Sequence, residues 1–421
     1  MRYPTSGQSD AKSQDPLVVD QIDQSQATYS KRFMNLLEAY PQYSQFSNEA
    51  WYPNSPGTYD SLESLHDQLH GLIGNGGHMS YLDYSAFDPV FWLHHTNIDR
   101  LFSIWQAIYP DSYMEPAVAT TGTATIKAGD KLDQDSPLTP FHKDTSNNFH
   151  TPSSVRDTET FGYSYPEING NDIPGVKRAV NALYGSSSGQ SIARRGEVEE
   201  RSNDSQPTAT IQLSTGVPSA SVQPSGAAQP SGVAAQIAGG LSEMPGPSNS
   251  SLDVLQQGTY QEWITNIRVL KTAVESTFFI HIFLGDFTND PKYWSIDPNL
   301  VGTHTVANPL VANPSQIHNT LVTGTIPLSA KLQLDADKGK FDMRNPTQVS
   351  TYLKDNLHWR ITKMDDSPVP LSEVAQLKIS VVSSVVMQAQ NVSDFPVWGE
   401  FTVHGDITDD KTGGLNVGEP S

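Results

Sequence analysis

The spacing of apolar residues changes part of the way along the chain. In the first part, residues 24–40 (QSQATYSKRFMNLLEAY) carry aromatic and aliphatic side chains at helical spacing. Two further helices are predicted at residues 61–73 and 89–107, each with one apolar stripe. Residues 1–184 are therefore predicted to form a mainly helical unit with long loops.

The second part follows a period of two, which is typical of strands. Apolar residues alternate with other residues at 326–334, 377–381 and 401–403, and residues 278–284 (FFIHIFL) form a continuous apolar run. The alternating segments predict strands with one buried face, and the continuous run predicts a strand buried on both faces. Residues 252–421 are therefore predicted to form an all-β, sandwich-like domain.

Between these parts, residues 185–251 are rich in serine, glycine, proline and alanine and nearly free of aromatic residues. A segment of this composition cannot bury enough apolar surface to offset its ordering entropy, so a disordered linker is predicted. The linker contains Arg194 and Arg195, a dibasic pair that is a candidate site for proteolytic processing. The predicted fold is thus multidomain: a helix bundle, a linker and a β domain.

Charge and composition exclude several classes of function. The formal net charge is −20, with 46 acidic and 26 basic residues, so neither nucleic acid nor an anionic membrane surface is an expected partner. No apolar run approaches the about 18 residues that span a bilayer, and residues 1–4 do not begin a signal peptide, so an intracellular (cytoplasmic) location is expected. The sequence has no cysteine, which leaves histidine and carboxylate as the candidate metal ligands.

Histidines gather on the two predicted helices that follow residue 60. His66 and His70 are four residues apart, so on a helix they lie on one face and can reach a single ion. Asp60 with Glu63 resembles a capping box that starts the first helix. His94 and His95 differ by about 100° around the second helix, so only one of them can face that ion, and spacing leaves open which.

Three histidines without cysteine suit copper or zinc. A zinc hydrolase is one alternative, although Glu63 is the only apparent general base for it. The opposite alternative is that these histidines are hydrogen-bonded core residues. An HxxxH pair followed by a His-His pair on a second helix, which the Asp88-Pro89 step would start, favours a metal site.

The residues around these histidines are similar to a known family. The block HDQLH followed by FDPVFWLHHTNIDRLFSIWQ, within residues 61–106, resembles the copper-B signature of fungal tyrosinases, which are type-3 copper polyphenol oxidases. The segments RYP at 2–4, FSNEAWY at 46–52 and FGYSYPE at 161–167 resemble the family as well. The linker and the β-rich part resemble the removable shielding domain of the fungal pro-enzymes.

The resemblance implies a ligand set and a chemistry. It makes His66, His70 and His95 the copper ligands and places His94 beside them. It implies a monooxygenase and oxidase that uses two copper ions and dioxygen to hydroxylate monophenols at the ortho position. The same enzymes oxidise o-diphenols to o-quinones, in melanin biosynthesis.

The resemblance also implies roles for neighbouring residues. Glu63 and Asp67 would help to orient a water molecule that deprotonates the bound phenol. Many family members carry asparagine where this chain has Asp67, so weaker hydroxylation is expected, because a carboxylate accepts hydrogen bonds but cannot donate as an amide does. Phe91 would shape the substrate side of the ligand ring, and Asp99 would make a hydrogen bond that either supports the fold or orients the surroundings of the ligands.

The chain departs from the family pattern in its histidine inventory. No histidine precedes His66, and the later histidines do not repeat the HxxxH spacing. The copper-A half is therefore expected to be missing through truncation, which would expose apolar side chains around Phe91, Trp92 and Phe102. Two functions remain open: an active phenol oxidase whose missing half comes from a partner chain, and an inactive copper-binding remnant or interaction protein. Aromatic residues of the β-rich part that could plug the site are Phe287, Tyr293 and Phe395.

Overall fold

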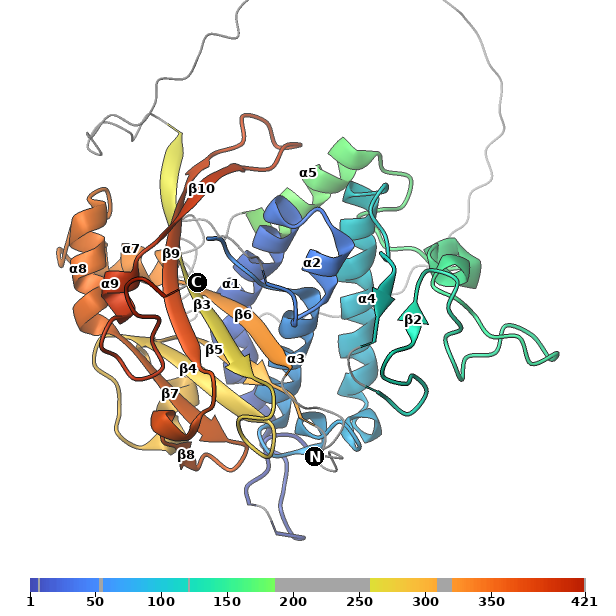
Figure 1. Ribbon diagram of the computed structural model, residues 1–421, viewed down its shortest axis with the longest axis horizontal. Coiled ribbons are helices and arrows are strands. Elements are labelled where there is room, and N and C mark those ends of the chain that lie inside the picture. The colour runs from blue at the N-terminus through green and yellow to red at the C-terminus, as the bar shows by residue number, and fades with distance from the viewer. Residues whose placement is uncertain (7, 53–55, 120–121, 186–257, 309–319, 420–421) are drawn as a thin grey trace, which may run out of the picture. The chain divides into compact units, whose positions relative to one another are not determined.

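The helical part is built from five α-helices in the computed structural model, which describes residues 1–421 except 7, 53–55, 120–121, 186–257, 309–319 and 420–421 (Figure 1). The predicted linker, with Arg194 and Arg195, lies almost wholly outside the described residues. The helices of this part are α1 (Asp15–Ala39), α2 (Tyr43–Ser47), α3 (Leu62–Gly74), α4 (Val90–Ile108) and α5 (Ile173–Tyr184).

Short elements connect these helices. Two 3-10 turns, η1 (His78–Ser80) and η2 (Ser85–Phe87), lie between α3 and α4. The long connection between α4 and α5 holds a two-stranded ladder of β1 (Ala117–Val118) and β2 (Lys131–Leu132) and the turns η3 (Ser153–Val155) and η4 (Thr158–Phe161). The three helices predicted from the apolar spacing are confirmed, and α1 begins nine residues before the predicted segment.

The predicted helix starts need one correction. Ser61, not Asp60, caps α3: its hydroxyl accepts a hydrogen bond from the Ser64 backbone N–H at 3.0 Å. Asp60 is instead engaged by the Arg32 guanidinium of α1. At α4, Asp88 accepts from the Val90 N–H at 3.0 Å, which agrees with its predicted role at the helix start.

The helical core forms where α1, α3 and α4 meet. Phe33 and Leu36 of α1, Leu65 of α3 and Trp105 of α4 are fully buried in it. The Trp105 ring stacks on Phe46 of α2 with centroids 4.5 Å apart. Burial of aromatic side chains of this size is the main stabilising contribution that such a small helix group can draw on. This core holds α3 and α4, which carry the histidines, side by side.

The second part contains two four-stranded antiparallel sheets. The strand order of one is β10-β9-β3-β6, and that of the other is β5-β4-β7-β8. Both sheets contribute to one apolar core, for example through Ile267 of β3 and Ile280 of β4. The bounds are β3 (Thr259–Leu270), β4 (Phe278–Leu284), β5 (Leu300–Val306), β6 (Leu321–Pro327), β7 (Leu357–Lys363), β8 (Pro368–Val369), β9 (Lys378–Met387) and β10 (Val397–Val403). The predicted β-rich part is confirmed, whereas its sandwich-like arrangement stays a prediction.

The alternation at residues 326–334 was a wrong indication of a strand. Strand β6 ends at Pro327, Leu328 follows it, and residues 329–334 lie in helix α7 (Ser329–Asp337). The other helical elements are η6 (Pro291–Ile296), α8 (Pro346–Asn356), η7 (Leu371–Glu373) and α9 (Gly405–Thr408). The prediction for residues 278–284 is confirmed, because all seven residues of β4 are buried.

The helices and the sheets contact each other through polar groups. The Thr323 N–H of β6 donates to the Glu49 carbonyl at 2.8 Å, and the Thr28 hydroxyl of α1 donates to the Val301 carbonyl at 3.1 Å. Gly71 of α3 lies so close to β5 that a Cβ there would be 2.5 Å from the Thr305 hydroxyl oxygen. Helix α3 is thus held on the side opposite α4 as well.

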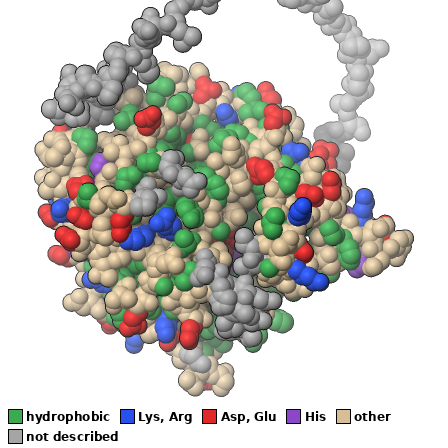
Figure 2. All heavy atoms as spheres, in the orientation of Figure 1, with side chains coloured by type: hydrophobic (Ala, Val, Ile, Leu, Met, Phe, Trp, Pro, Cys, Tyr) green, Lys and Arg blue, Asp and Glu red, His purple; other side chains and the backbone are tan. Residues whose placement is uncertain are grey.

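The surface agrees with the acidic composition. Acidic side chains are scattered over the face in Figure 2 among hydrophobic and neutral groups, with no single large patch. Within the described residues no helix is both long and apolar enough to cross a membrane. The location in the cell stays a prediction.

Candidate metal centre

Three histidine rings from two helices meet at one point. Helix α3 presents His66 and His70 on one face, one turn apart, and α4 presents His95 toward them. The Nε2 atom of His66 lies 3.0 Å from Nε2 of His70 and 3.0 Å from Nε2 of His95. Two imidazole nitrogens that bind one ion at about 2.0–2.1 Å each lie about 3 Å apart, so this spacing fits a shared metal ion.

The far side of each ring determines where its proton sits. His70 Nδ1 is 2.8 Å from the Met79 carbonyl oxygen, and His95 Nδ1 is 2.7 Å from the Phe91 carbonyl oxygen. A carbonyl only accepts hydrogen bonds, so both Nδ1 atoms must be donors. A neutral imidazole has a single ring proton, and Nε2 of both rings therefore carries a bare lone pair.

His66 completes the set in a different way. Its Nδ1 lies 2.8 Å from the carboxylate of Asp67, which orients the ring as the carbonyls orient the other two. Burial, together with the charge of His66, lowers the pKa of His70 to about 4, and burial lowers the pKa of His95. The rings of His70 and His95 therefore stay neutral at neutral pH, as metal ligands require. Three lone pairs that face one point repel each other unless a cation lies between them.

His94 lies close to the same point but is differently engaged. Its ring stacks on His66 with centroids 5.0 Å apart, and ring nitrogens of His66, His70 and His94 all lie within 4.8 Å of one another. Proximity alone would therefore admit His94 as a ligand. Its Nε2 donates to the His66 backbone carbonyl at 3.2 Å, which leaves the lone pair on its buried Nδ1. His95 differs because its Nε2 lies 3.0 Å from Nε2 of His66. That contact favours His95, and the ligand set stays a prediction.

The two acids predicted to assist catalysis lie behind the histidines. Asp67 is 5% exposed and contacts His66, as described above. Glu63 accepts a hydrogen bond from the Glu49 backbone N–H at 3.0 Å, so it does not cap its own helix. Burial, and next the negative charge of Asp67, raise the pKa of Glu63. Their predicted role in orienting a water molecule remains a prediction.

Lys271 reaches this acid group from the end of β3. Its Nζ lies 2.7 Å from a Glu49 carboxylate oxygen, and Glu49 is 2% exposed. Burial raises the pKa of Glu49 to about 8 despite the opposing charge of Lys271. Sequence reasoning did not identify Glu49 or Lys271 as part of the site, because no local pattern links positions 222 residues apart.

Phe91 contacts the ring of His95, whereas Asp99 contacts the FGYSYPE segment. The Phe91 ring lies 3.8 Å from the His95 ring, centroid to centroid, where it can shape the space beside the ligands. Asp99 accepts hydrogen bonds from the hydroxyls of Tyr163 at 2.8 Å and Tyr165 at 2.6 Å. These bonds tie the FGYSYPE segment to α4, and the role of Asp99 at the site stays a prediction.

The expected exposed apolar side chains are found in part. Trp92 is 62% exposed, which agrees with the prediction. Phe91 packs against His95 and is only partly exposed, and Phe102 is held in the helical core, where it stacks with Trp105. The prediction therefore fails for Phe102, because α2 and the preceding loop supply a cover that the apolar stripe of α4 does not reveal.

The aromatic residues considered as plugs have other surroundings. Phe287 stacks on Phe283 in the β-rich part with centroids 4.2 Å apart. Phe395 packs against the helical core, where Lys177 of α5 lies 4.9 Å from its ring centre. The side chain of Tyr293 is 54% exposed. All three positions are accounted for by contacts or exposure that do not involve the histidines.

Comparisons with known proteins agree with this site. Residues 2–108 match the model of the common central domain of tyrosinase, and residues 262–381 match that of the tyrosinase C-terminal domain. A tyrosinase of Neurospora crassa is 31% identical over 98% of this chain and 67% of its own length. A tyrosinase of Podospora anserina is 31% identical over 80% of this chain and 60% of its own length.

A solved structure shares the fold. Recombinant mushroom tyrosinase superposes with a TM-score of 0.66 at 22% identity, over 96% of this chain and 64% of that one. A helix pair with three converging histidines, followed by a β-rich part, defines a copper protein of the tyrosinase type. The chain belongs to the tyrosinase family.

Copper is the metal of this family, and imidazole nitrogen is a donor that suits it. The bare Nε2 lone pairs of His66, His70 and His95 satisfy that requirement. The chain spans 67% of the length of the Neurospora protein and 60% of that of the Podospora protein.

Proposed function

We propose that this tyrosinase-family copper oxidoreductase acts on phenolic and catecholic small molecules with dioxygen. Its reactions would be ortho-hydroxylation of monophenols and oxidation of o-diphenols to o-quinones, which polymerise to melanin-type products. The observation that supports the proposal is the convergence of three Nε2 lone pairs, each set by a hydrogen bond on the far side of its ring. Copper, when bound, supplies the electrons that dioxygen takes up.

The chain's own residues have distinct tasks in this proposal. His66, His70 and His95 hold the ion, and the Asp67 carboxylate fixes the His66 ring. Glu63 accepts the phenol proton through a water molecule: its raised pKa makes its ionised form a stronger base than an ordinary glutamate.

The proposal extends to the parts that surround the site. The two sheets would pack as a sandwich and shield the copper site until the linker is cleaved at Arg194 and Arg195. The common core of the two sheets supports the sandwich. The resemblance to the fungal pro-enzymes supports the processing step, which concerns residues outside the described part of the chain.

A second function is a copper-binding protein without oxidase activity. The observation that favours it is that the described residues bring together one histidine cluster that could hold a metal ion. Reduction of dioxygen at a type-3 site uses two copper ions. The two functions differ in the number of copper ions bound: two at the site of an oxidase, and one per chain in a copper-binding protein.

The ligand set can be tested by copper titration of the purified chain. Alanine variants at His66, His70 and His95 are expected to lose tight copper binding, measured by competition with a copper chelator. The matched control is His94→Ala, which removes an adjacent buried imidazole and is expected to retain one copper per chain. Loss of copper in His94→Ala, with retention in His95→Ala, would show that the adjacent histidine is the ligand.

Activity is tested on the copper-loaded chain with catechol and with a monophenol in air. Quinone formation, followed by its visible absorbance, supports the oxidase, and His95→Ala should abolish it. One copper per chain with no quinone from either compound supports the copper-binding protein. One zinc per chain in protein purified without added metal would contradict both.

A further inference from the structure

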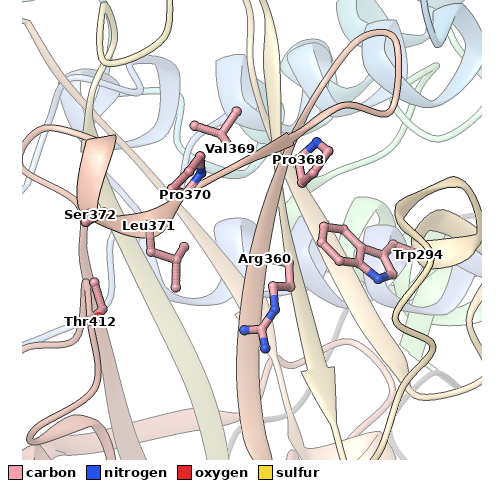
Figure 3. Close-up of a pocket in the computed structure, with 8 residues that line it drawn as sticks. All are labelled: Trp294, Arg360, Pro368, Val369, Pro370, Leu371, Ser372 and Thr412. Atoms are coloured by element: carbon pink, nitrogen blue, oxygen red, sulfur yellow. The ribbon is translucent and has the colours of Figure 1, made fainter.

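An open cavity lies in the β-rich part, beside the edge strand β8. Its volume is about 450 Å³. Figure 3 shows Arg360 of β7 between Trp294 on one side and Leu371 and Thr412 on the other, with Pro368 of β8 above it. A cavity of this size suits a small organic ligand. Nothing in the copper chemistry described above uses it.

Arg360 is the charged group of this cavity and has no acidic partner among the described residues. Its side chain is half-buried, and the guanidinium donates one hydrogen bond, to the Trp359 carbonyl at 2.7 Å. The charge also lies 5.0 Å from the centre of the Phe287 ring. A guanidinium has five N–H donors, so most of its donating capacity is left for another group.

Two other arginines with low exposure each have an acidic partner. Arg32 is fully buried and pairs with the Asp60 carboxylate, and Arg100 pairs with Glu167. Burial alone lowers the pKa of Arg360, because no neighbouring acid compensates its charge. A half-buried cation without a carboxylate partner among the described residues, in a chain of net charge −20, can accept a carboxylate from outside.

The residues that line the cavity determine which ligands fit beside Arg360. Trp294, Pro368 and Leu371 present apolar surface, and Pro368 has no N–H to offer. We propose that this cavity binds a small aromatic carboxylate. Its carboxylate accepts hydrogen bonds from the free N–H groups of Arg360, and its ring lies against the apolar walls.

The test uses the 421-residue chain without copper, so that the histidine cluster binds no probe through the metal. The probe is trans-cinnamate, and its neutral counterpart is cinnamyl alcohol; binding is measured by calorimetry and by saturation-transfer NMR. Cinnamate is expected to bind about tenfold or more tightly than the alcohol, because a charge-assisted hydrogen bond is lost in the alcohol. Equal binding of the two compounds would overturn the proposal.

Variants locate the binding. Arg360→Gln keeps a donor and removes the charge, and it is expected to weaken cinnamate binding about tenfold. The control Arg344→Gln changes an arginine that is 82% exposed and should leave binding unchanged. Thr412→Trp fills the cavity from an exposed position and should block cinnamate even if Arg360→Gln folds poorly. Unchanged binding in Arg360→Gln or in Thr412→Trp contradicts the assignment.

Two further probes separate the aromatic carboxylate from anions in general. Acetate and inorganic phosphate carry the charge without the ring. Weak binding of both, relative to cinnamate, supports the proposal. Binding of either as tight as that of cinnamate would show a site for anions only and overturn the aromatic part.

Discussion

Arg32 on α1 is the residue whose removal should damage the fold most directly. Its guanidinium donates to both carboxylate oxygens of Asp60, at 2.7 and 2.5 Å. It also donates to Gln68 and to the Ser64 hydroxyl of α3, each at 2.7 Å. Asp60 in turn accepts from the Thr325 hydroxyl of β6 at 2.7 Å. One side chain thus links α1, α3 and the β-rich part.

The expected cost of Arg32→Leu follows from burial. Arg32 is 0% exposed and Asp60 is 3% exposed, so the substitution leaves a buried negative charge with only two neutral donors, the Thr325 hydroxyl and the Ser61 N–H. Breaking a buried pair in this way costs about 3–5 kcal/mol. A domain is stable by only about 5–15 kcal/mol, so the variant should be close to unfolding.

The assay is urea denaturation followed by tryptophan fluorescence. Arg344→Leu is the control, because its pair with Asp342 is exposed and should be worth about 0–1 kcal/mol. The double variant Arg32→Leu/Asp60→Leu removes both charges and should recover part of the loss. A loss of less than about 1 kcal/mol in Arg32→Leu would refute the reasoning, because surface pairs alone reach that value.

Two further predictions concern the contact between the helices and the sheets. Gly71→Leu places a Cβ 2.5 Å from the Thr305 hydroxyl oxygen and should cost about 1–3 kcal/mol in the same urea assay; Gly185→Leu, whose Cβ would meet nothing nearer than 3.5 Å, is its control. Burial raises the pKa of Glu38 from 4.5 to about 7 against the opposing charge of Lys31, so the native chain keeps a proton that the unfolded chain releases. The Glu38 contribution to stability therefore falls as pH rises from 4.5 to 7. The variant Glu38→Gln retains an acceptor for the Trp398 N–H and should flatten that fall. An unchanged slope of unfolding free energy against pH would contradict the prediction.

The histidine helices could be predicted because their signals are local. The four-residue spacing of His66 and His70 and the helix start at Asp88-Pro89 are signals that act within one or two helical turns. Both helices, α3 and α4, formed as expected. The choice between His94 and His95 could not come from spacing, because it depends on where each ring lies relative to Nε2 of His66, which belongs to another helix.

The strand wrongly predicted at residues 326–334 also depends on a long-range contact that local spacing does not show. Among its alternating apolar residues, Leu328 and Leu332 are fully buried, and a separation of four residues fits one face of a helix as well as it fits a strand. The Ser329 hydroxyl at the start of α7 accepts from the Trp263 N–H of β3 at 2.8 Å. That long-range bond helps to fix the helix start, and short apolar runs do not reveal it.

The position of α3 connects the two parts of the protein to the proposed copper site. One face of this helix carries His66 and His70, and its other side meets β5 through Gly71 and Thr305. The Ser64 hydroxyl is also 3.3 Å from His304 Nδ1 of β5. A break between residues 185 and 258 removes none of these contacts, so cleavage of the linker alone would leave the sheets attached to the helix that carries two of the three proposed ligands. Release of the proposed shielding domain would require these buried polar contacts to break as well, and their loss would loosen the proposed ligands.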